Sequence, residues 1–284
     1  MNQAVLESAR ISTGLRAALT FIAPSAKKPV FESSAYTGGA PRLYFETERH
    51  TVEIADMRPL AGTLSLDGHG FELRRSKTEV TDLYDDTAVE TRYYREIEAL
   101  LRDVMGASRV VIFDATRRSD DGAGAQNREG TRGPASRVHV DYTEKSGPQR
   151  VRDFFGAAEA GRLMDSAARI VQINVWRPIR GPVQRSPLAV ADAASIRPED
   201  LIATDQVFPN RVGEIYHLAY NPAQRWYHAP EMEADEVLLI KGWDSLADGR
   251  ARFTPHGAFD LPDMKADAAP RESIEVRTLV VIED

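Results

Sequence analysis

The stretch RVHVDYT, residues 137–143, marks the point at which the character of the chain changes and the fold can be inferred. From there short β-rich runs recur, with Pro, Gly and Asp between them, at residues 137–142, 169–177, 212–220, 235–242 and 273–282. Many short strands separated by turn residues are typical of a sandwich or jelly roll. We therefore predict a mainly β fold with added helices, whose core over residues 136–284 is a double-stranded β-helix, the cupin-like jelly roll.

Residues 1–135 are predicted to add strands and one supporting helix to this core, so that residues 1–284 form a single domain. The helix spans residues 87–105, because apolar residues recur there at helical spacing: Val89, Tyr93, Ile97, Leu100, Leu101 and Val104. We expect Thr87 and Glu90 to form its capping box and Gly106 to end it.

Shorter patterns predict the remaining elements. Residues 17–23 are expected to form a helix or a strand, residues 36–60 a hairpin, residues 109–114 a strand, and residues 148–166 a second helix. The segment 117–136 is rich in Gly and charge, which predicts a mobile surface loop and a candidate lid. It lacks the Gly-Lys-Ser/Thr ending of a phosphate-binding loop. Since strands and helices do not alternate, a doubly wound nucleotide-binding sheet is not expected.

Composition limits the possible partners of the chain. A net charge of −7 does not favour nucleic acid or an anionic membrane. No apolar stretch approaches the roughly 18 residues that a membrane span needs. Because the chain has no cysteine, disulfides, iron–sulfur clusters and cysteine nucleophiles are excluded. We expect a cytoplasmic protein that binds a small-molecule substrate.

His139 and Asp141 in the opening stretch are candidate metal ligands. Because side chains alternate along a strand, these two residues lie on the same face and can hold one ion together. One further, distant histidine would complete a two-His-one-carboxylate triad, which binds iron(II) and leaves three coordination positions open. Those positions suit a chelating co-substrate, 2-oxoglutarate, together with O₂.

The third ligand has to be chosen among His217, His228 and His256. A 2-oxoglutarate enzyme needs a cation for the distal carboxylate of the co-substrate, and the forked guanidinium of Arg binds a carboxylate in two places. Each histidine has a cation downstream, namely Arg225 after His217, Lys241 after His228, and Arg271 after His256. We favour His256, while the other two stay open.

Arg271 and Ser273 open the last predicted strand and are our candidate anchor for 2-oxoglutarate, with Arg277 as the second choice. Asn174 and Arg177 lie in another predicted strand and are further candidates for contact with the co-substrate. Tyr142 and Thr143, which follow Asp141, are candidates for hydrogen bonds that orient the metal ligands.

A family resemblance covers residues 85–284. The ordered set RVHVDYT, NVWRP, EVLLIKGWDS, RFTPHGAF and PRESIEVR resembles the CmcJ/AsaB-like hydroxylase/desaturase family. The resemblance implies that His256 is the distal iron ligand, that Arg271 anchors 2-oxoglutarate, and that His228 faces substrate or solvent. Such enzymes hydroxylate or desaturate by hydrogen abstraction from an iron(IV)-oxo species, releasing succinate and CO₂. A small secondary metabolite is the implied substrate.

Two other classes of protein fit parts of the pattern. One is a metal-dependent jelly-roll enzyme that does not use 2-oxoglutarate, and the other is a non-catalytic jelly-roll binding module. The ordered set of His139, Asp141, His256 and Arg271 argues against the binding module. Fold alone does not define the substrate.

Overall fold

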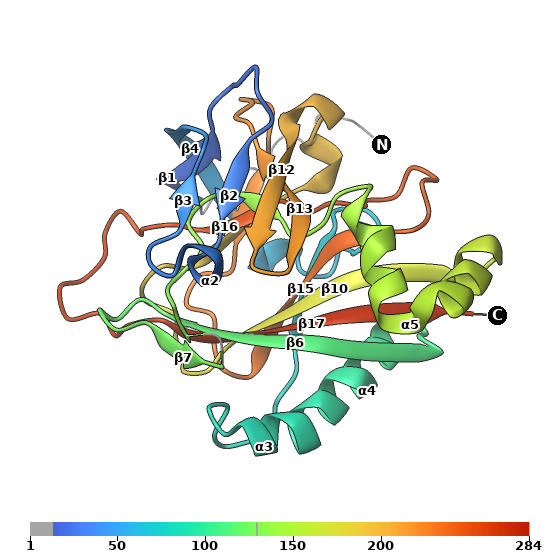
Figure 1. Ribbon diagram of the computed structural model, residues 1–284. Coiled ribbons are helices and arrows are strands. Elements are labelled where there is room, and N and C mark those ends of the chain that lie inside the picture. The colour runs from blue at the N-terminus through green and yellow to red at the C-terminus, as the bar shows by residue number, and fades with distance from the viewer. Residues whose placement is uncertain (1–13, 129, 284) are drawn as a thin grey trace, which may run out of the picture.

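Two β-sheets make up the body of the protein, whose computed structural model describes residues 14–128 and 130–283. The smaller sheet has the order β5-β15-β10-β17-β6, with bounds Phe71–Arg75, Glu236–Asp244, Arg169–Pro178, Glu272–Ile282 and Arg109–Ser119. Every neighbouring pair in it is antiparallel. Figure 1 shows β10, β15, β17 and β6 side by side in the lower half of the molecule.

The larger sheet has ten strands in the order β1-β4-β14-β11-β16-β9-β13-β12-β2-β3. Their bounds, in that order, are Leu15–Ile22, Thr47–Asp56, Trp226–His228, Leu188–Ala191, His256–Ala258, His139–Val140, Arg211–Leu218, Leu201–Phe208, Val30–Glu32 and Arg42–Leu43. From β9 to β17 the chain crosses repeatedly between the two sheets, which is the path of a double-stranded β-helix. The predicted jelly-roll fold is therefore confirmed.

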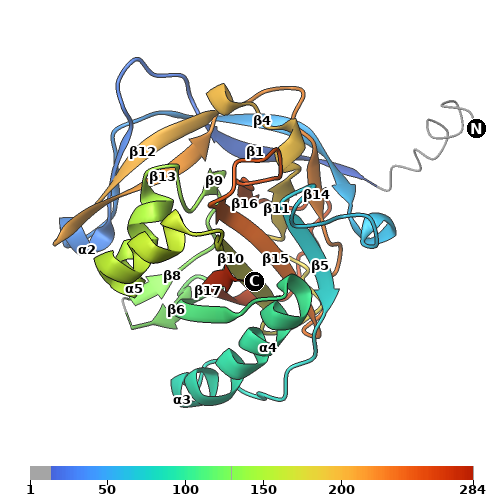
Figure 2. The same cartoon turned by 90° about the vertical axis from the view of Figure 1, so that its right-hand side faces the viewer.

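The predicted helix over residues 87–105 is present as three consecutive pieces: α3 (Asp86–Ala88), the π-helical turn η2 (Val89–Tyr93) and α4 (Tyr94–Met105). Its apolar face packs on the five-stranded sheet, with Ile97 and Leu101 buried against Val171 and Val276. Figure 2 shows α4 outside that sheet. Gly106 ends the helix in the left-handed conformation, as predicted.

The predicted capping box of this helix is wrong. Asp85 is the N-cap, and its Oδ1 accepts hydrogen bonds from the backbone N–H of Thr87 at 2.9 Å and of Ala88 at 3.3 Å. The carboxylate of Asp85 thus bonds to backbone N–H groups of the first helical turn, as an N-cap residue does. The helix therefore begins at Asp86, one residue before the predicted start.

The other helices are α2 (Ser34–Thr37), α5 (Ser146–Asp165) and the 3₁₀ turns η1 (Arg58–Leu60), η3 (Ala193–Ser195) and η4 (Pro198–Asp200). The second predicted helix corresponds to α5, but Gly156 interrupts it with φ 77° and ψ 161°. Among the described residues, no helix combines the length and apolar character needed to cross a bilayer.

Several predictions for the N-terminal part need correction. Residues 36–60 do not form a hairpin, because β4 pairs with β1 and β3 pairs with β2. The predicted strand 109–114 continues to Ser119 as β6, inside the segment predicted as a loop. That segment also holds the hairpin of β7 (Ala125–Asn127) and β8 (Gly130–Arg132).

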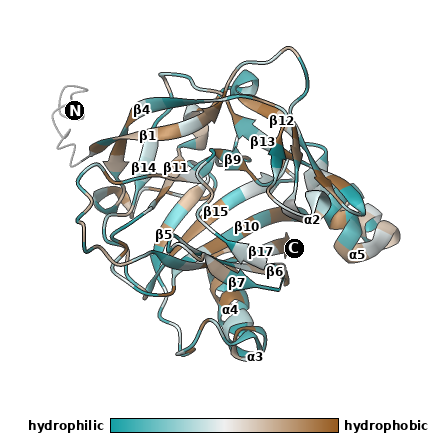
Figure 3. Ribbon diagram, turned by 60° about the vertical axis from the view of Figure 1, so that its left-hand side comes forward, coloured by the Kyte–Doolittle hydropathy of each residue, from teal (hydrophilic) through white to brown (hydrophobic). Residues whose placement is uncertain are grey.

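Strands β5 and β6 come from the part of the chain that we placed outside the jelly roll, yet both belong to the five-stranded sheet. Residue 135 is therefore not a boundary between core and support, and the single domain stays a prediction. Within residues 136–284 the sequence analysis also missed the strands β11, β12, β14 and β16, and before residue 136 it missed β2 and β5. Figure 3 shows hydrophobic residues in both sheets and in α4, with mostly hydrophilic loops around them.

Candidate metal centre

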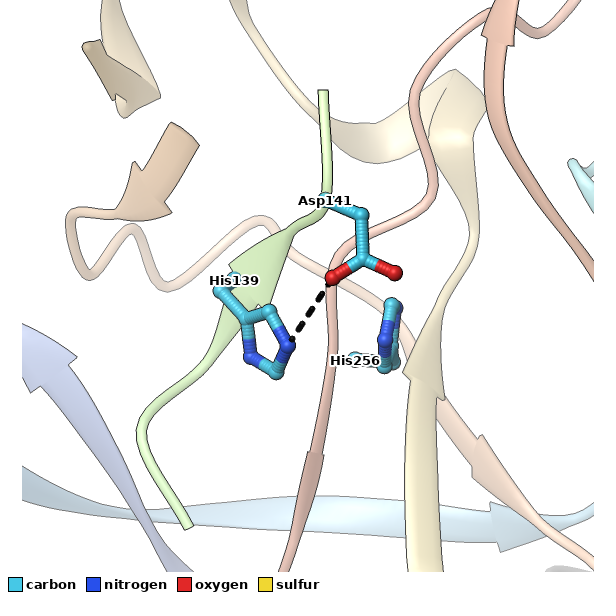
Figure 4. A group of neighbouring side chains, drawn as sticks. All are labelled: His139, Asp141 and His256. Carbon is cyan, nitrogen blue, oxygen red and sulfur yellow. Dashed lines mark ion pairs between the residues drawn. The ribbon is translucent and has the colours of Figure 1, made fainter. Parts of the chain in front are cut away.

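Three side chains converge between the two sheets: His139 on β9, Asp141 just after it, and His256 on β16 (Figure 4). One ligand atom from each lies within 4.8 Å of the others. β9 and β16 are neighbours, and His256 is paired directly with His139, so their ring centroids are 4.7 Å apart. The Nε2 of His139 lies 3.5 Å from Oδ1 of Asp141.

The backbone sets the tautomer of both imidazoles. Nδ1 of His139 lies 2.8 Å from the carbonyl oxygen of Arg137, and Nδ1 of His256 lies 3.0 Å from that of Thr254. A carbonyl oxygen can only accept, so each Nδ1 carries the proton and donates it. The lone pair of each imidazole is then on Nε2, where a metal ion can bind.

The two oxygens of Asp141 have different tasks. Oδ2 accepts a hydrogen bond from Nδ2 of Asn174 at 2.7 Å and another from Nε of Arg277 at 3.0 Å. Oδ1 is the oxygen that faces His139. Because Oδ2 is occupied by two donors, the carboxylate presents one oxygen to a metal ion, which leaves more of the ion's coordination positions open.

The charge states of these groups also suit a metal ion. Burial alone would raise the pKa of the Asp141 carboxyl, but Arg277, His139 and His256 hold that pKa well below its usual range. Burial and the neighbouring His139 lower the pKa of His256, which keeps its imidazole neutral. Two imidazoles and one carboxylate are the donor set of a two-His-one-carboxylate site.

His217 and His228 do not join this group. His217 is paired with His139 on the other side of β9, but its Nδ1 bonds to Oγ1 of Thr204 at 3.0 Å, and burial lowers its pKa to about 3. His228 packs edge-on against Phe259, and its Nδ1 has no hydrogen-bond partner. His228 is buried, so the expectation that it faces solvent is wrong.

Arg277, our second choice of anchor, is surrounded by acids. Besides Asp141, its guanidinium pairs with Asp114 at 2.5 Å and with Glu275 at 2.5 Å. Burial would lower the pKa of Arg277, but these carboxylates raise it well above its ordinary value. Its N–H groups are therefore already in use.

Arg271 has a different environment. Its side chain is 2% exposed, its guanidinium lies 5.7 Å from the ring centroid of Trp176, and its terminal nitrogen donates to the carbonyl oxygen of Ser186 at 2.7 Å. Its Nε has no hydrogen-bond partner. Ser273, two residues later on the same strand face, is also buried. Arg271 therefore keeps N–H donors available in the interior.

The structure changes the interpretation of Asn174 and Arg177. Asn174 contacts Asp141 rather than an anchor position, and its amide is oriented by Gln172, whose Nε2 donates to Oδ1 of Asn174 at 2.5 Å. Arg177 points to the opposite face of β10, where it bonds to Tyr93 and to the carbonyl oxygens of Ala234 and Ser76. The prediction that Arg177 contacts the co-substrate is therefore wrong.

Tyr142 and Thr143 do not orient the ligands either. Thr143 donates to Glu214 at 2.7 Å and accepts from the amides that begin α5, and Tyr142 is buried beside Trp243. The residues that do contact Asp141, Asn174 and Arg277, come from distant strands. The sequence analysis named both as candidates for contact with 2-oxoglutarate, not as residues that hold Asp141.

An open cleft with a volume of about 610 Å³ is not lined by any of the three candidate ligands. Segments 119–124 and 131–136 line it together with Ala258, which is two residues after His256. The segment predicted as a lid therefore forms one wall of a cleft beside β16. Its role in covering a substrate stays a prediction.

Comparison with known proteins gives consistent matches over most of the chain. Residues 19–281 match the family described as Oxidoreductase/YMDC permease-like domain. The Hydroxylase/desaturase efuI of Hormonema carpetanum is 35% identical over 272 residues, which cover 87% of this chain and 88% of efuI. The Hydroxylase/desaturase asaB of Aspergillus flavus is 40% identical over 149 residues, 47% of this chain and 64% of asaB.

A solved structure shares the whole fold. The iron and alpha-ketoglutarate-dependent endoperoxidase NvfI superimposes with a TM-score of 0.83 at 30% identity, covering 94% of this chain and 98% of NvfI. NvfI of Aspergillus novofumigatus is named an Fe(II)/2-oxoglutarate-dependent dioxygenase.

Proposed function

We infer the function from one premise: this chain belongs to the Oxidoreductase/YMDC permease-like family, among hydroxylase/desaturases and Fe(II)/2-oxoglutarate-dependent dioxygenases that match it over nearly its whole length. It is an Fe(II)/2-oxoglutarate-dependent dioxygenase, an oxidoreductase that hydroxylates or desaturates a small molecule of secondary metabolism. The resemblance to the hydroxylase/desaturase family is thereby confirmed. The full-length similarity to these relatives is the observation that carries this conclusion.

For this chain we propose that His139, Asp141 and His256 hold the iron(II). Their support is that one ligand atom of each lies within 4.8 Å of the others, while both Nδ1 atoms are bonded to backbone carbonyls and Oδ2 of Asp141 to Asn174. Neutral imidazole and carboxylate are the donors that a non-haem iron(II) site uses. When bound, iron(II) with 2-oxoglutarate and O₂ supplies an oxidant that removes hydrogen from a C–H bond, with release of succinate and CO₂.

The chain's own residues prepare the site for this chemistry. Arg277 and Asn174 hold Asp141 so that one oxygen faces the metal position. The backbone carbonyls of Arg137 and Thr254 fix both imidazole tautomers. Burial of His256 and of Asn174 excludes water from that side, which strengthens every polar contact made there.

We propose Arg271 and Ser273 as the residues that bind the distal carboxylate of 2-oxoglutarate. Arg271 is buried with an unpartnered Nε, whereas Arg277 is already paired with three carboxylates. Burial lowers the pKa of Arg271 to about 10, so at neutral pH it is still a cation that needs an anion. A cytoplasmic location is also proposed, because a chain without cysteine suits a reducing compartment.

The test of the metal assignment is iron content together with succinate formation from 2-oxoglutarate in the presence of O₂. His256→Ala should lose iron and succinate formation, whereas His228→Ala, a change at another buried histidine, should retain iron. Iron retained in His256→Ala and lost in His228→Ala would refute the proposed ligand set. Iron binding without 2-oxoglutarate-dependent succinate in the wild type would instead favour a jelly-roll metalloenzyme of another kind.

The anchor is tested by the concentration of 2-oxoglutarate that the enzyme needs. Breaking a buried ion pair costs about 3–5 kcal/mol, so Arg271→Ala should raise the KM for 2-oxoglutarate by at least about a hundredfold. Ser273→Ala should raise it by roughly tenfold, since one hydrogen bond to a charged group is lost. Iron content should stay normal in both variants. A normal KM in Arg271→Ala would exclude this residue as the anchor.

A further inference from the structure

Arg118 lies beside the proposed anchor, although it is far from it in the sequence. In the ladder between β6 and β17, Arg118 is paired directly with Ser273, and paired residues of antiparallel strands share a face. Ser273 is buried, and Arg118, which is half-buried, therefore starts on the same face of the sheet as Ser273. Its neighbour Arg117 points the other way, to Leu83 and Asp86.

Among residues 14–128 and 130–283, no carboxylate lies within 4 Å of the guanidinium of Arg118 or of Arg271, although the backbone N–H of Arg271 donates to Oδ1 of Asp120 at 2.7 Å. Each guanidinium makes one hydrogen bond to a backbone carbonyl, Arg118 to Gly133 at 2.9 Å and Arg271 to Ser186 at 2.7 Å. A guanidinium has five N–H donors, so most of the donors of both residues are unused by these contacts. Arg277, six residues beyond Arg271, shows the contrast with its three acidic partners.

The two guanidinium groups are close enough to affect each other. Burial lowers the pKa of both, and the charge of Arg118 lowers the pKa of Arg271 further. Asp120 raises the pKa of Arg271, and Glu275 raises the pKa of both arginines, but the Asp120 side chain is paired with Arg185 and that of Glu275 with Arg277. Two like charges in a poorly solvated interior are costly unless an anion lies between them.

We propose that Arg118 and Arg271 together bind the distal carboxylate of 2-oxoglutarate, with one guanidinium supplied by β6, the other by the start of β17, and the Ser273 hydroxyl between them. This inference rests on the proposed function and extends it by a second cation. A carboxylate has about four lone-pair positions, so two guanidinium groups and a hydroxyl can all donate to it.

The test compares two oxo acids on the Fe(II) protein without oxygen. One is 2-oxoglutarate, and the other is 2-oxopentanoate, which has the same carbon chain but no distal carboxylate. The ratio of their dissociation constants, measured by calorimetry, isolates the recognition of that carboxylate. Arg118→Met should reduce this preference for 2-oxoglutarate by about tenfold to a hundredfold, because a charge-assisted contact is lost. The affinity for 2-oxopentanoate should be unchanged.

A matched control is Arg109→Met. Arg109 is another half-buried arginine of β6 whose Nε has no partner, but it is at the other end of the strand, over Phe155 rather than beside Arg271. Its loss should leave the preference for 2-oxoglutarate unchanged. A reduced preference in Arg109→Met with a normal one in Arg118→Met would overturn the proposal.

Thermal unfolding of the protein without 2-oxoglutarate separates binding from a structural role. If Arg118 only ties Gly133 to β6, Arg118→Met should lower the Tm and weaken both oxo acids equally, which would overturn the proposal. Under our proposal the same variant keeps or raises the Tm, since one of two unpaired charges is removed. If neither oxo acid binds the wild-type Fe(II) protein, the proposed function fails; if only the ratio fails to respond to Arg118→Met, this inference fails alone.

Discussion

Replacing Asn174 by Leu should weaken metal binding without unfolding the protein. Asn174 is fully buried on β10, and its Nδ2 donates to Oδ2 of Asp141 at 2.7 Å. Leu has the same branching and the same number of side-chain heavy atoms as Asn, so the change removes the donor while the shape of the side chain is largely kept. Arg277 then remains as the only described side chain that donates to this carboxylate oxygen.

The magnitude follows from the kind of bond that is lost. A hydrogen bond to a charged group contributes about 1.5–3 kcal/mol, and every 1.4 kcal/mol corresponds to about a tenfold change in a dissociation constant. The hydrogen bond between Asn174 and Asp141 is also present in the metal-free protein. Only the part of its free energy that differs between the metal-free and the metal-bound protein therefore changes the dissociation constant. We therefore expect the dissociation constant for the metal to rise by about tenfold to a hundredfold, the usual range for residues that orient ligands.

The assay is a titration of the metal-free protein with Co(II) in competition with a chromophoric chelator. A suitable control is Thr278→Val, because Thr278 is equally buried in the neighbouring strand and its Oγ1 donates to the carbonyl oxygen of Ile173 at 2.9 Å. This control loses one buried hydrogen bond that does not involve Asp141. Equal Co(II) affinity in Asn174→Leu and the wild type, or equal weakening in both variants, would refute the orienting role of Asn174.

Two further changes test the acid sensitivity and the helix start. Burial lowers the pKa of His228 from 6.5 to about 4. As the pH falls below 6.5, this histidine therefore takes up a proton in the unfolded state before it does so in the folded state. The free energy of unfolding falls as a result, by at most about 3 kcal/mol. In chemical denaturation, the free energy of unfolding of His228→Phe should therefore fall less between pH 7 and pH 4.5 than that of the wild type. An equally large fall in both proteins would contradict this prediction. Asp85→Ala should cost about 0.5–2 kcal/mol as a lost N-cap, whereas Thr87→Ala, at an exposed position, should cost less than about 0.5 kcal/mol. A larger effect at Thr87 would restore the capping box.

The long elements of the fold could be predicted because their patterns are repetitive. Strands β10, β15 and β17 are 10, 9 and 11 residues long and carry several apolar residues in runs or in alternation, and α4 carries an apolar stripe. Such patterns identify an element whatever its neighbours are. By contrast, β16 has three residues, His256–Ala258, and its partners on both sides are in other parts of the chain. A segment this short has no period of its own.

The candidate metal centre could be predicted only where its residues are close together in the sequence. His139 and Asp141 are two residues apart on one strand, and this local spacing is visible in the sequence. The contacts that hold Asp141 come from Asn174 and Arg277, which are 33 and 136 residues away. Asn174 and Arg277 are cross-strand partners in the ladder between β10 and β17. The order of the strands in the sheet therefore brings them together, and that order cannot be derived from the sequence patterns alone.

Strand β17 separates stability from function on its two faces. Ile274 and Val276 face the core under α4, while the residues between and around them on the other face are polar, namely Arg271, Ser273, Glu275 and Arg277. The apolar face makes the strand recognisable, and its pairing with β10 and β6 defines the register. A shift of that register by one residue would turn the polar side chains out of the interior. The apolar packing therefore does more than stabilise the sheet. It places Arg277 at Asp141, and it places the guanidinium of Arg271, which has no ion pair among the described residues, beside Arg118.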